Sequence, residues 1–175
     1  MKPYDLQEVV ATLQAVHPHD WKSFFEERVY KVAPRAPLGG ILSGGWRVAS
    51  TNAVTKAIQA WNTAQKGLDL AYSIGLQLGE DGVIHDVVKG LAASEAGMVP
   101  GGHILAVNGR RWTPDVLRAS LRASTERPVE LLVERQDFFH TYTLQYTGGE
   151  RYPVLTRDTT TPDILGQIAS PVSKP

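Results

Sequence analysis

Residues 72–112 restrict the fold of this chain more than any other stretch. They read YSIGLQLGEDGVIHDVVKGLAASEAGMVPGGHILAVNGRRW. Short apolar segments alternate there with glycine and other small residues, a pattern typical of short strands joined by tight turns. With the few residues before it, this stretch predicts strands over 69–78, 82–88 and 103–107, a short helix over 92–96 and a tight turn at Asn108-Gly109.

The residues that follow continue the alternation of helix and strand. TPDVLRASLRAS predicts a helix, because Thr113 can cap its amino terminus and Pro114 suits its first turn. PVELLVER and HTYTLQY predict two further strands, with a turn in QDFF between them. Short strands with one small helix among them, and a longer helix before the last two, predict an α+β fold: a partly open β-barrel with two helices.

A short helical segment precedes this region. DLQEVVATLQAV, residues 5–16, is amphipathic, with Asp5 and Glu8 at capping-box spacing, and Asp20 can cap a second helix. Residues 33–46 are rich in proline and glycine and predict an irregular connection. WRVAST then predicts a short strand, and NAVTKAIQAWNTAQKG predicts a helix that stops at Gly67.

These patterns divide the chain into four parts. The parts are a helical segment over 1–33, a linker over 34–45, a β-rich domain over 46–147 with a helical insertion over 52–67, and an extended carboxy-terminal tail over 148–175. The tail is polar and punctuated by proline. We therefore expect it to run extended over the surface, with a helical turn near PDILGQI.

Composition excludes several classes of partner. The 175 residues carry 18 basic and 18 acidic side chains, whereas a surface for nucleic acid or an anionic membrane needs a basic excess. The chain has no cysteine, which excludes disulfides and zinc–thiolate sites but fits cytoplasm and periplasm equally. No apolar run reaches the roughly 18 residues needed to span a bilayer. We expect no nucleic-acid partner and no membrane partner.

Two motifs within residues 69–147 resemble those of PDZ domains. SIGL, residues 73–76, is similar to the family's carboxylate-binding loop, in which a small residue, an apolar residue, glycine and a second apolar residue follow one another. GLAASEAGMVPGGHILAVNGR is similar to the signature of bacterial PDZ domains. The chain departs from that signature at Gly102, where the family usually has aspartate; we expect this turn to lie away from the groove.

Segments outside those motifs resemble one group of enzymes. DLQEVVATLQAVHPHDWKSFFEERVY, APLGGILSGGW and RYPVLTRD are similar to the carboxy-terminal third of the glycyl aminopeptidases, zinc metallopeptidases with a PDZ domain after a thermolysin-like catalytic domain. The resemblance implies that residues 1–33 are the last helices of a catalytic domain whose remainder, with its zinc ion, is absent. The parent protein is then expected to be a bacterial metallo-aminopeptidase.

The chain lacks the residues for that catalysis. The group's zinc site needs two histidines one helical turn apart, a glutamate between them and another carboxylate downstream. His17 and His19 are only two residues apart and would point to different faces of a helix. The remaining histidines are isolated: His85, His103 and His140. No serine has the strand–nucleophile–helix context of a hydrolase. We expect no catalytic residue, metal site, cofactor or enzymatic activity in this chain.

The PDZ resemblance implies a peptide-binding site around Gly75. Backbone N–H groups of the loop that begins at Ser73 would converge on the carboxylate of a peptide terminus, and a side chain at Gly75 could block the turn or the ligand. Ile74 and Leu76 would line the pocket for the last ligand side chain. Gln77 and Leu78 would pair with the peptide as an added strand.

The predicted helix over 114–123 would form the opposite wall of that groove. Leu117 and Leu121 lie at i and i+4, so both would face the peptide. In an alternative, these leucines face the core and leave Val116 and Ser120 on the groove, and the spacing leaves both open. No histidine begins the helix, where one class of PDZ domains hydrogen-bonds a serine or threonine of the ligand; the resemblance therefore implies a preference for an apolar ligand terminus.

Two functions are compatible with these residues. In the first, the chain is a non-catalytic PDZ module that binds peptide or protein C-termini for the attached peptidase, by strand addition and carboxylate capture. In the alternative, the domain has an intramolecular structural or gating role, and braces the parent's own catalytic domain while the groove is shut or filled by the chain itself.

Overall fold

The computed structural model describes residues 3–33 and 36–171. The chain divides into two compact units, one formed by Met1–Trp46 with Thr159–Pro175 and the other by Arg47–Asp158. Within the described residues, no helix combines the length and the apolar character that crossing a membrane requires.

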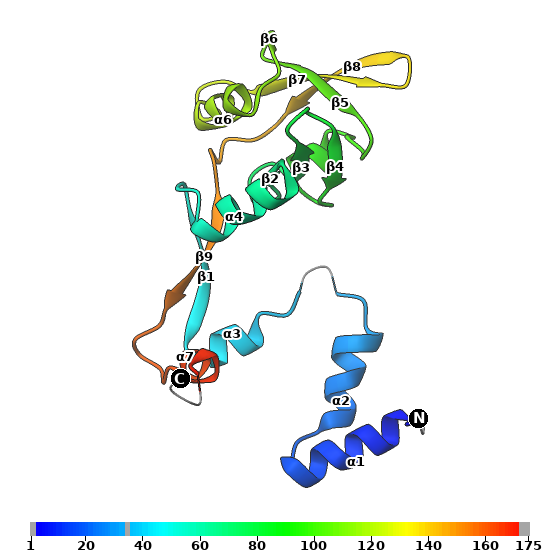
Figure 1. The fold of residues 1–175 in the computed structure, drawn as a ribbon, viewed down its shortest axis with the longest axis vertical. Coiled ribbons are helices and arrows are strands. Elements are labelled where there is room, and N and C mark those ends of the chain that lie inside the picture. Colours follow the sequence, from blue (N-terminus) through cyan, green and yellow to red (C-terminus); the bar gives the residue numbers. More distant parts are fainter. Residues whose placement is uncertain (1–2, 34–35, 172–175) are drawn as a thin grey trace. The chain divides into compact units, whose positions relative to one another are not determined.

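The first unit contains the amino-terminal helices (Figure 1). α1 spans Leu6–Val16, and α2 spans Trp21–Phe25 before it continues as a π-helical turn, η1, over Glu26–Tyr30. The predicted caps are confirmed. The N–H of Glu8 donates to Asp5 Oδ1 at 2.8 Å, and the N–H of Ser23 donates to Asp20 Oδ1 at 3.0 Å.

Two short helices complete this unit: α3 spans Gly39–Ser43 and α7 spans Ile164–Ala169. α7 is the helical turn expected near PDILGQI, but α3 lies where the sequence predicted only a connection. The N–H of Leu165 donates to the Gly44 carbonyl at 3.0 Å, and the Trp46 indole donates to Asp163 Oδ1 at 2.8 Å. The end of α3 is thus held by residues more than 100 positions away, which local proline and glycine content does not reveal.

The second unit is built mainly from two antiparallel sheets. The smaller sheet has the order β2-β3-β4, with strands over Gly67–Leu70, Leu76–Gly79 and Ile84–Val87. The larger has the order β6-β5-β7-β8, with strands over Arg110–Arg111, His103–Val107, Val129–Arg135 and Phe138–Leu144. The single strand expected over 69–78 is wrong, because the loop 71–75 breaks it into β2 and β3.

The helices of this unit begin and end near the expected residues. They are α4 (Lys56–Gln65), α5 (Ala92–Glu95) and α6 (Pro114–Arg122). Thr113 caps α6 as predicted, accepting a hydrogen bond from the N–H of Val116 at 3.1 Å. The turn after β5 is also confirmed, with Asn108 and Gly109 at φ of 48° and 73°. α4 ends one residue early, because Lys66 rather than Gly67 adopts the left-handed conformation.

The carboxy-terminal tail belongs to the second unit up to Asp158. β9 (Tyr152–Arg157) pairs with β1 (Trp46–Thr51), the strand predicted from WRVAST. Glu150 and Tyr152 are only 4% and 1% exposed, so the expectation that the tail runs over the surface is wrong for them. Glutamate is buried only when it is paired, and the side chains that pair with Glu150 from outside the tail lie on α6.

The hydrophobic core lies between the two sheets, α5 and α6. Its fully buried members include Leu70, Ile74 and Leu76 from the smaller sheet and its loop, Ile104 and Leu131 from the larger sheet, and Leu117 and Leu121 from α6. This order of strands and helices around one core confirms the predicted α+β, PDZ-like class (Figure 1). None of the sheets in the described part of the chain closes into a complete barrel.

Candidate functional site

The loop 71–75 turns sharply between β2 and β3. Gly75 has a φ of +83°, a left-handed conformation that favours glycine. The N–H groups of Ser73 and Gly75 both point back to the carbonyl of Leu70, at 3.0 Å and 3.1 Å. Ile74 is fully buried. The amides expected to converge on a ligand carboxylate are therefore partly used inside the loop, and carboxylate capture by them stays a prediction.

β3 is paired along both of its edges. On one side Gln77 pairs with Asp69 and Leu78 with Leu68, and on the other side β3 pairs with β4. Adding a peptide strand requires a free row of N–H and C=O groups. Both edges of β3 are occupied, so a peptide can pair with Gln77 and Leu78 only where β2 or β4 leaves its place.

α6 contributes its apolar face to the core. Leu117 and Leu121 have no exposed surface, and they pack in the cluster that also contains Ile74 and Leu76. This is the placement that the alternative assignment gave the two leucines. Val116 is half-buried and Ser120 is buried. Five of the eight predicted binding residues lie in this one buried cluster: Ile74, Leu76, Leu78, Leu117 and Leu121.

Residues 146–152, here called the bridging segment, contact both the loop and α6. The Ser73 hydroxyl donates to the Arg151 carbonyl at 3.0 Å, and the Arg151 N–H donates to the same hydroxyl at 2.9 Å. Just beyond the end of α6, the N–H of Gly149 donates to Ser124 Oγ at 3.2 Å. The chain's own backbone therefore lies against the loop that the sequence assigned to carboxylate binding.

A buried charge cluster holds the bridging segment to α6. Arg118 Nε donates to Glu150 Oε1 at 2.6 Å, and Arg122 Nη1 donates to Glu150 Oε2 at 2.7 Å. The Tyr152 hydroxyl also donates to Glu150 Oε1, at 2.7 Å. The carboxylate thus accepts three hydrogen bonds on its two oxygens, two of them from cations, which are the stronger kind.

These contacts set the ionisation of the cluster. Burial alone raises the pKa of Glu150, but hydrogen bonds from Tyr152, Arg118 and Arg122 outweigh it and hold that pKa below its ordinary value. Burial and the hydrogen bond to Glu150 together raise the pKa of Tyr152 to about 12. At neutral pH the cluster therefore contains a carboxylate, two guanidinium groups and a neutral phenol.

Sequence reasoning missed the residues of this cluster. Arg118 and Arg122 lie at i and i+4 on the helix that was assigned to the groove, each directly after one of the leucines, and this spacing was the available signal. Glu150 gave no local signal, because its partners on α6 lie 28 and 32 residues away.

Gly102 lies at the end of the turn before β5 and packs against the core. A Cβ there would lie 2.8 Å from Val133 Cγ1 and 3.3 Å from Ile84 Cδ1. The side chain of the aspartate that the PDZ signature usually has would clash at its Cβ with these two apolar side chains. Close packing on Val133 is a physical reason for glycine at this position.

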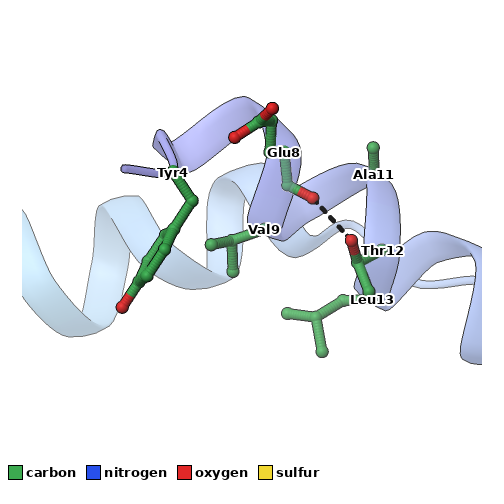
Figure 2. Close-up of a pocket in the computed structure, with 6 residues that line it drawn as sticks. All are labelled: Tyr4, Glu8, Val9, Ala11, Thr12 and Leu13. Atoms are coloured by element: carbon green, nitrogen blue, oxygen red, sulfur yellow. Dashed lines mark hydrogen bonds between the residues drawn. The ribbon is translucent and has the colours of Figure 1, made fainter. Parts of the chain in front are cut away.

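Two surface hollows lie outside this region. The first is in the amino-terminal helices, where Tyr4, Val9 and Leu13 point to one side of α1 and Thr12 donates to the Glu8 carbonyl at 2.8 Å (Figure 2). The second is lined by His103, Ile104, Leu105, Arg111 and Trp112. Neither includes a predicted binding residue. Among the described residues, no three histidine, aspartate or glutamate side chains lie together as metal ligands.

Replacing Gly75 with alanine should lower the free energy of unfolding by about 2–4 kcal/mol. The new side chain would be strained at a φ of +83°, and its Cβ would lie 2.8 Å from Leu91 Cβ. Urea denaturation followed by tryptophan fluorescence measures the change. Gly90→Ala is the matched control, because Gly90 has a φ of +78° but no atom within 4 Å of its Cβ position. Equal losses in the two variants would contradict tight packing of the loop on Leu91.

Comparison with known proteins gives structural similarity only. No family model matches the sequence, and no curated protein matches it. The structure is similar to the crystal structure of an aminopeptidase N family protein from Idiomarina loihiensis, with a TM-score of 0.57 and 18% sequence identity, over 93% of this chain and 28% of that chain. The chain thus spans little more than a quarter of that protein. A second match is the HtrA3 PDZ domain bound to a phage-derived ligand, FGRWV, with a TM-score of 0.34 and 15% identity, over 63% of this chain and 92% of that chain.

Proposed function

We propose that this chain is the non-catalytic carboxy-terminal region of an aminopeptidase-type metallopeptidase, and that its PDZ-like domain has an intramolecular structural or gating role. Two lines support the parentage. The sequence resembles the glycyl aminopeptidases along most of its length, and the fold is similar to part of an aminopeptidase N family protein over 93% of this chain. In this proposal the zinc ion and the catalytic residues belong to the parent's catalytic domain.

One observation carries the intramolecular role: the bridging segment bonds to both the loop and α6. Arg151 is bonded to the loop through Ser73, and Glu150 is bonded to α6 through Arg118 and Arg122. A domain that binds its own carboxy-terminal segment in this way is suited to a structural role rather than to the capture of external peptides. Bracing or gating of the attached catalytic domain follows as its role.

The binding of peptide or protein C-termini is the second candidate function. The contact at Ser73 favours it, since the hydroxyl satisfies both the N–H and the carbonyl of one residue, Arg151, whatever its side chain. Recognition of this kind suits an extended peptide of any sequence. In this candidate the peptide replaces the bridging segment, and its terminal carboxylate meets the N–H groups around Gly75.

A peptide screen separates the two candidates. The wild-type chain should bind no member of a fluorescent library of free C-terminal peptides more tightly than about 1 mM, because an intramolecular segment competes at a high effective concentration. Each peptide is paired with its C-terminally amidated form as the control. Binding that amidation abolishes would replace the structural role with capture of C-termini. Binding that amidation leaves unchanged would contradict both.

The structural role also predicts a loss of stability or activity in the parent enzyme when this domain is removed. Deleting residues 46–158 from the parent should lower its thermal stability or its peptidase activity, because the catalytic domain loses its brace. An unchanged melting temperature together with unchanged turnover would contradict the structural role.

A further inference from the structure

Two arginines of α6 bind the Glu150 carboxylate as a binding site binds its ligand, and we call the arginines the receptor side. The receptor side consists of Arg118 and Arg122, one helical turn apart on α6. Their guanidinium groups each bond to a different oxygen of the Glu150 carboxylate, at 2.6 Å and 2.7 Å. One carboxylate bound by two parallel cationic donors is the arrangement in which proteins recognise a carboxylate ligand.

The two sides of the pair differ in their access to solvent. The Glu150 side chain is 3% exposed, whereas that of Arg122 is 58% exposed and that of Arg118 is 26% exposed. The arginines can therefore stay hydrated when no carboxylate is present, but Glu150 is buried only where they bind it. Loss of the carboxylate therefore costs the two arginines less free energy than loss of the arginines costs the buried Glu150.

Other contacts hold the bridging segment without the Glu150 side chain. Its backbone bonds to Ser73 through Arg151 and to Ser124 through Gly149, and the Tyr146 hydroxyl donates to the Gly149 carbonyl at 2.8 Å. Removing the Glu150 side chain alone should thus leave a space of carboxylate size beside two arginines and the Tyr152 hydroxyl.

We infer that Arg118 and Arg122 form a carboxylate-binding site of the PDZ-like groove, and that Glu150 occupies it as a built-in ligand. The inference rests on the proposed function, in which the domain binds its own bridging segment. An external ligand of this site is a peptide that carries a carboxylate, either as an acidic side chain or as a free C-terminus, and it binds when the Glu150 side chain does not occupy the site. The site on α6 thus supplies charge that the loop around Gly75 lacks.

Chemical rescue of the Glu150→Ala chain tests the site. Sodium acetate at 0.2 M should raise the melting temperature of this variant by about 2–6 °C more than sodium chloride at equal ionic strength, because acetate binds the vacated site only in the folded state. The wild-type chain should respond equally to both salts. If the variant is unfolded in chloride, acetate should restore its native tryptophan fluorescence. No difference between the salts, or no recovery, would overturn the inference.

Two further variants assign the effect to the arginines. Glu150→Gln keeps the space filled, so acetate should have no specific effect on it. The double variant Arg118→Ala with Glu150→Ala keeps the space but lacks one of the two arginines, so the acetate effect should fall to that of chloride. A full acetate effect in the double variant would place the anion elsewhere and would contradict the assignment.

Two small probes distinguish the source of the carboxylate. N-acetyl-glycylglycine presents a peptide C-terminus, and N-acetyl-glutamic acid α-amide presents a glutamate side chain. The probe that raises the melting temperature of Glu150→Ala more identifies the preferred source, and no effect from either limits the site to free acetate and overturns the peptide inference. If the probes have no effect, the expected results of the peptide screen and of the parent deletion do not change. The inference can therefore fail while the proposed function stands.

Discussion

Replacing Tyr152 with alanine should lower the free energy of unfolding by about 3–5 kcal/mol, the largest loss we expect from any single substitution considered for this chain. Tyr152 is 1% exposed, and it is the largest of the fully buried side chains in the described residues. Its truncation leaves a cavity, and it also removes the hydroxyl that donates to Glu150 at 2.7 Å. Urea denaturation followed by tryptophan fluorescence measures the loss, because Trp112 packs against the core.

Tyr152→Phe divides this loss into its parts. The phenylalanine keeps the packing and removes only the hydrogen bond to a charged acceptor, so its cost should be about 1.5–3 kcal/mol. A loss below about 1 kcal/mol for Tyr152→Ala would mean that the region beyond residue 147 is a surface tail after all. The bridging segment would then have no structural role.

Replacing Leu117 with alanine should lower the free energy of unfolding by about 2–5 kcal/mol. The sequence assigned Leu117 to a groove wall, where truncation would weaken ligand binding and leave stability nearly unchanged. The structure places it in the core with no exposed surface, so truncation leaves a cavity among residues that include Ile74 and Leu121. The same denaturation experiment measures the change.

Leu155→Ala is the matched control for Leu117→Ala. Leu155 lies on β9 in the same unit and is 47% exposed, so its truncation should cost less than about 1 kcal/mol. If Leu117→Ala lowers the free energy of unfolding as little as Leu155→Ala does, Leu117 lies on a groove wall and not in the core.

The placement of Leu117, Leu121 and the bridging segment bears on how this domain handles peptides. A groove of the expected kind needs a free strand edge and an exposed apolar helix face. Here β2 pairs with β3, and the leucines of α6 are in the core. A peptide that pairs with β3 must therefore displace a strand of this chain, and we expect its affinity to be reduced by the cost of that displacement.

Local signals predicted most of the elements. The caps at Asp5, Asp20 and Thr113 act on N–H groups three residues away, so they can be read without knowing the fold. The turn at Asn108-Gly109 depends only on backbone conformations that these residues adopt readily. The α+β class followed from the order of such elements, and the break in the strand expected over 69–78 was the main error of this kind.

The sequence by itself determined most of the helices and strands of this protein, because the forces that decide them act mainly between residues a few positions apart. Only the tertiary structure decided which strand edges are paired and which charged side chain is buried. Glu150 is bonded to Arg118 across 32 positions, and Ser73 to Arg151 across 78. Contacts of that separation depend on how the chain packs, since a glutamate in a polar segment reads as exposed until its partners are known.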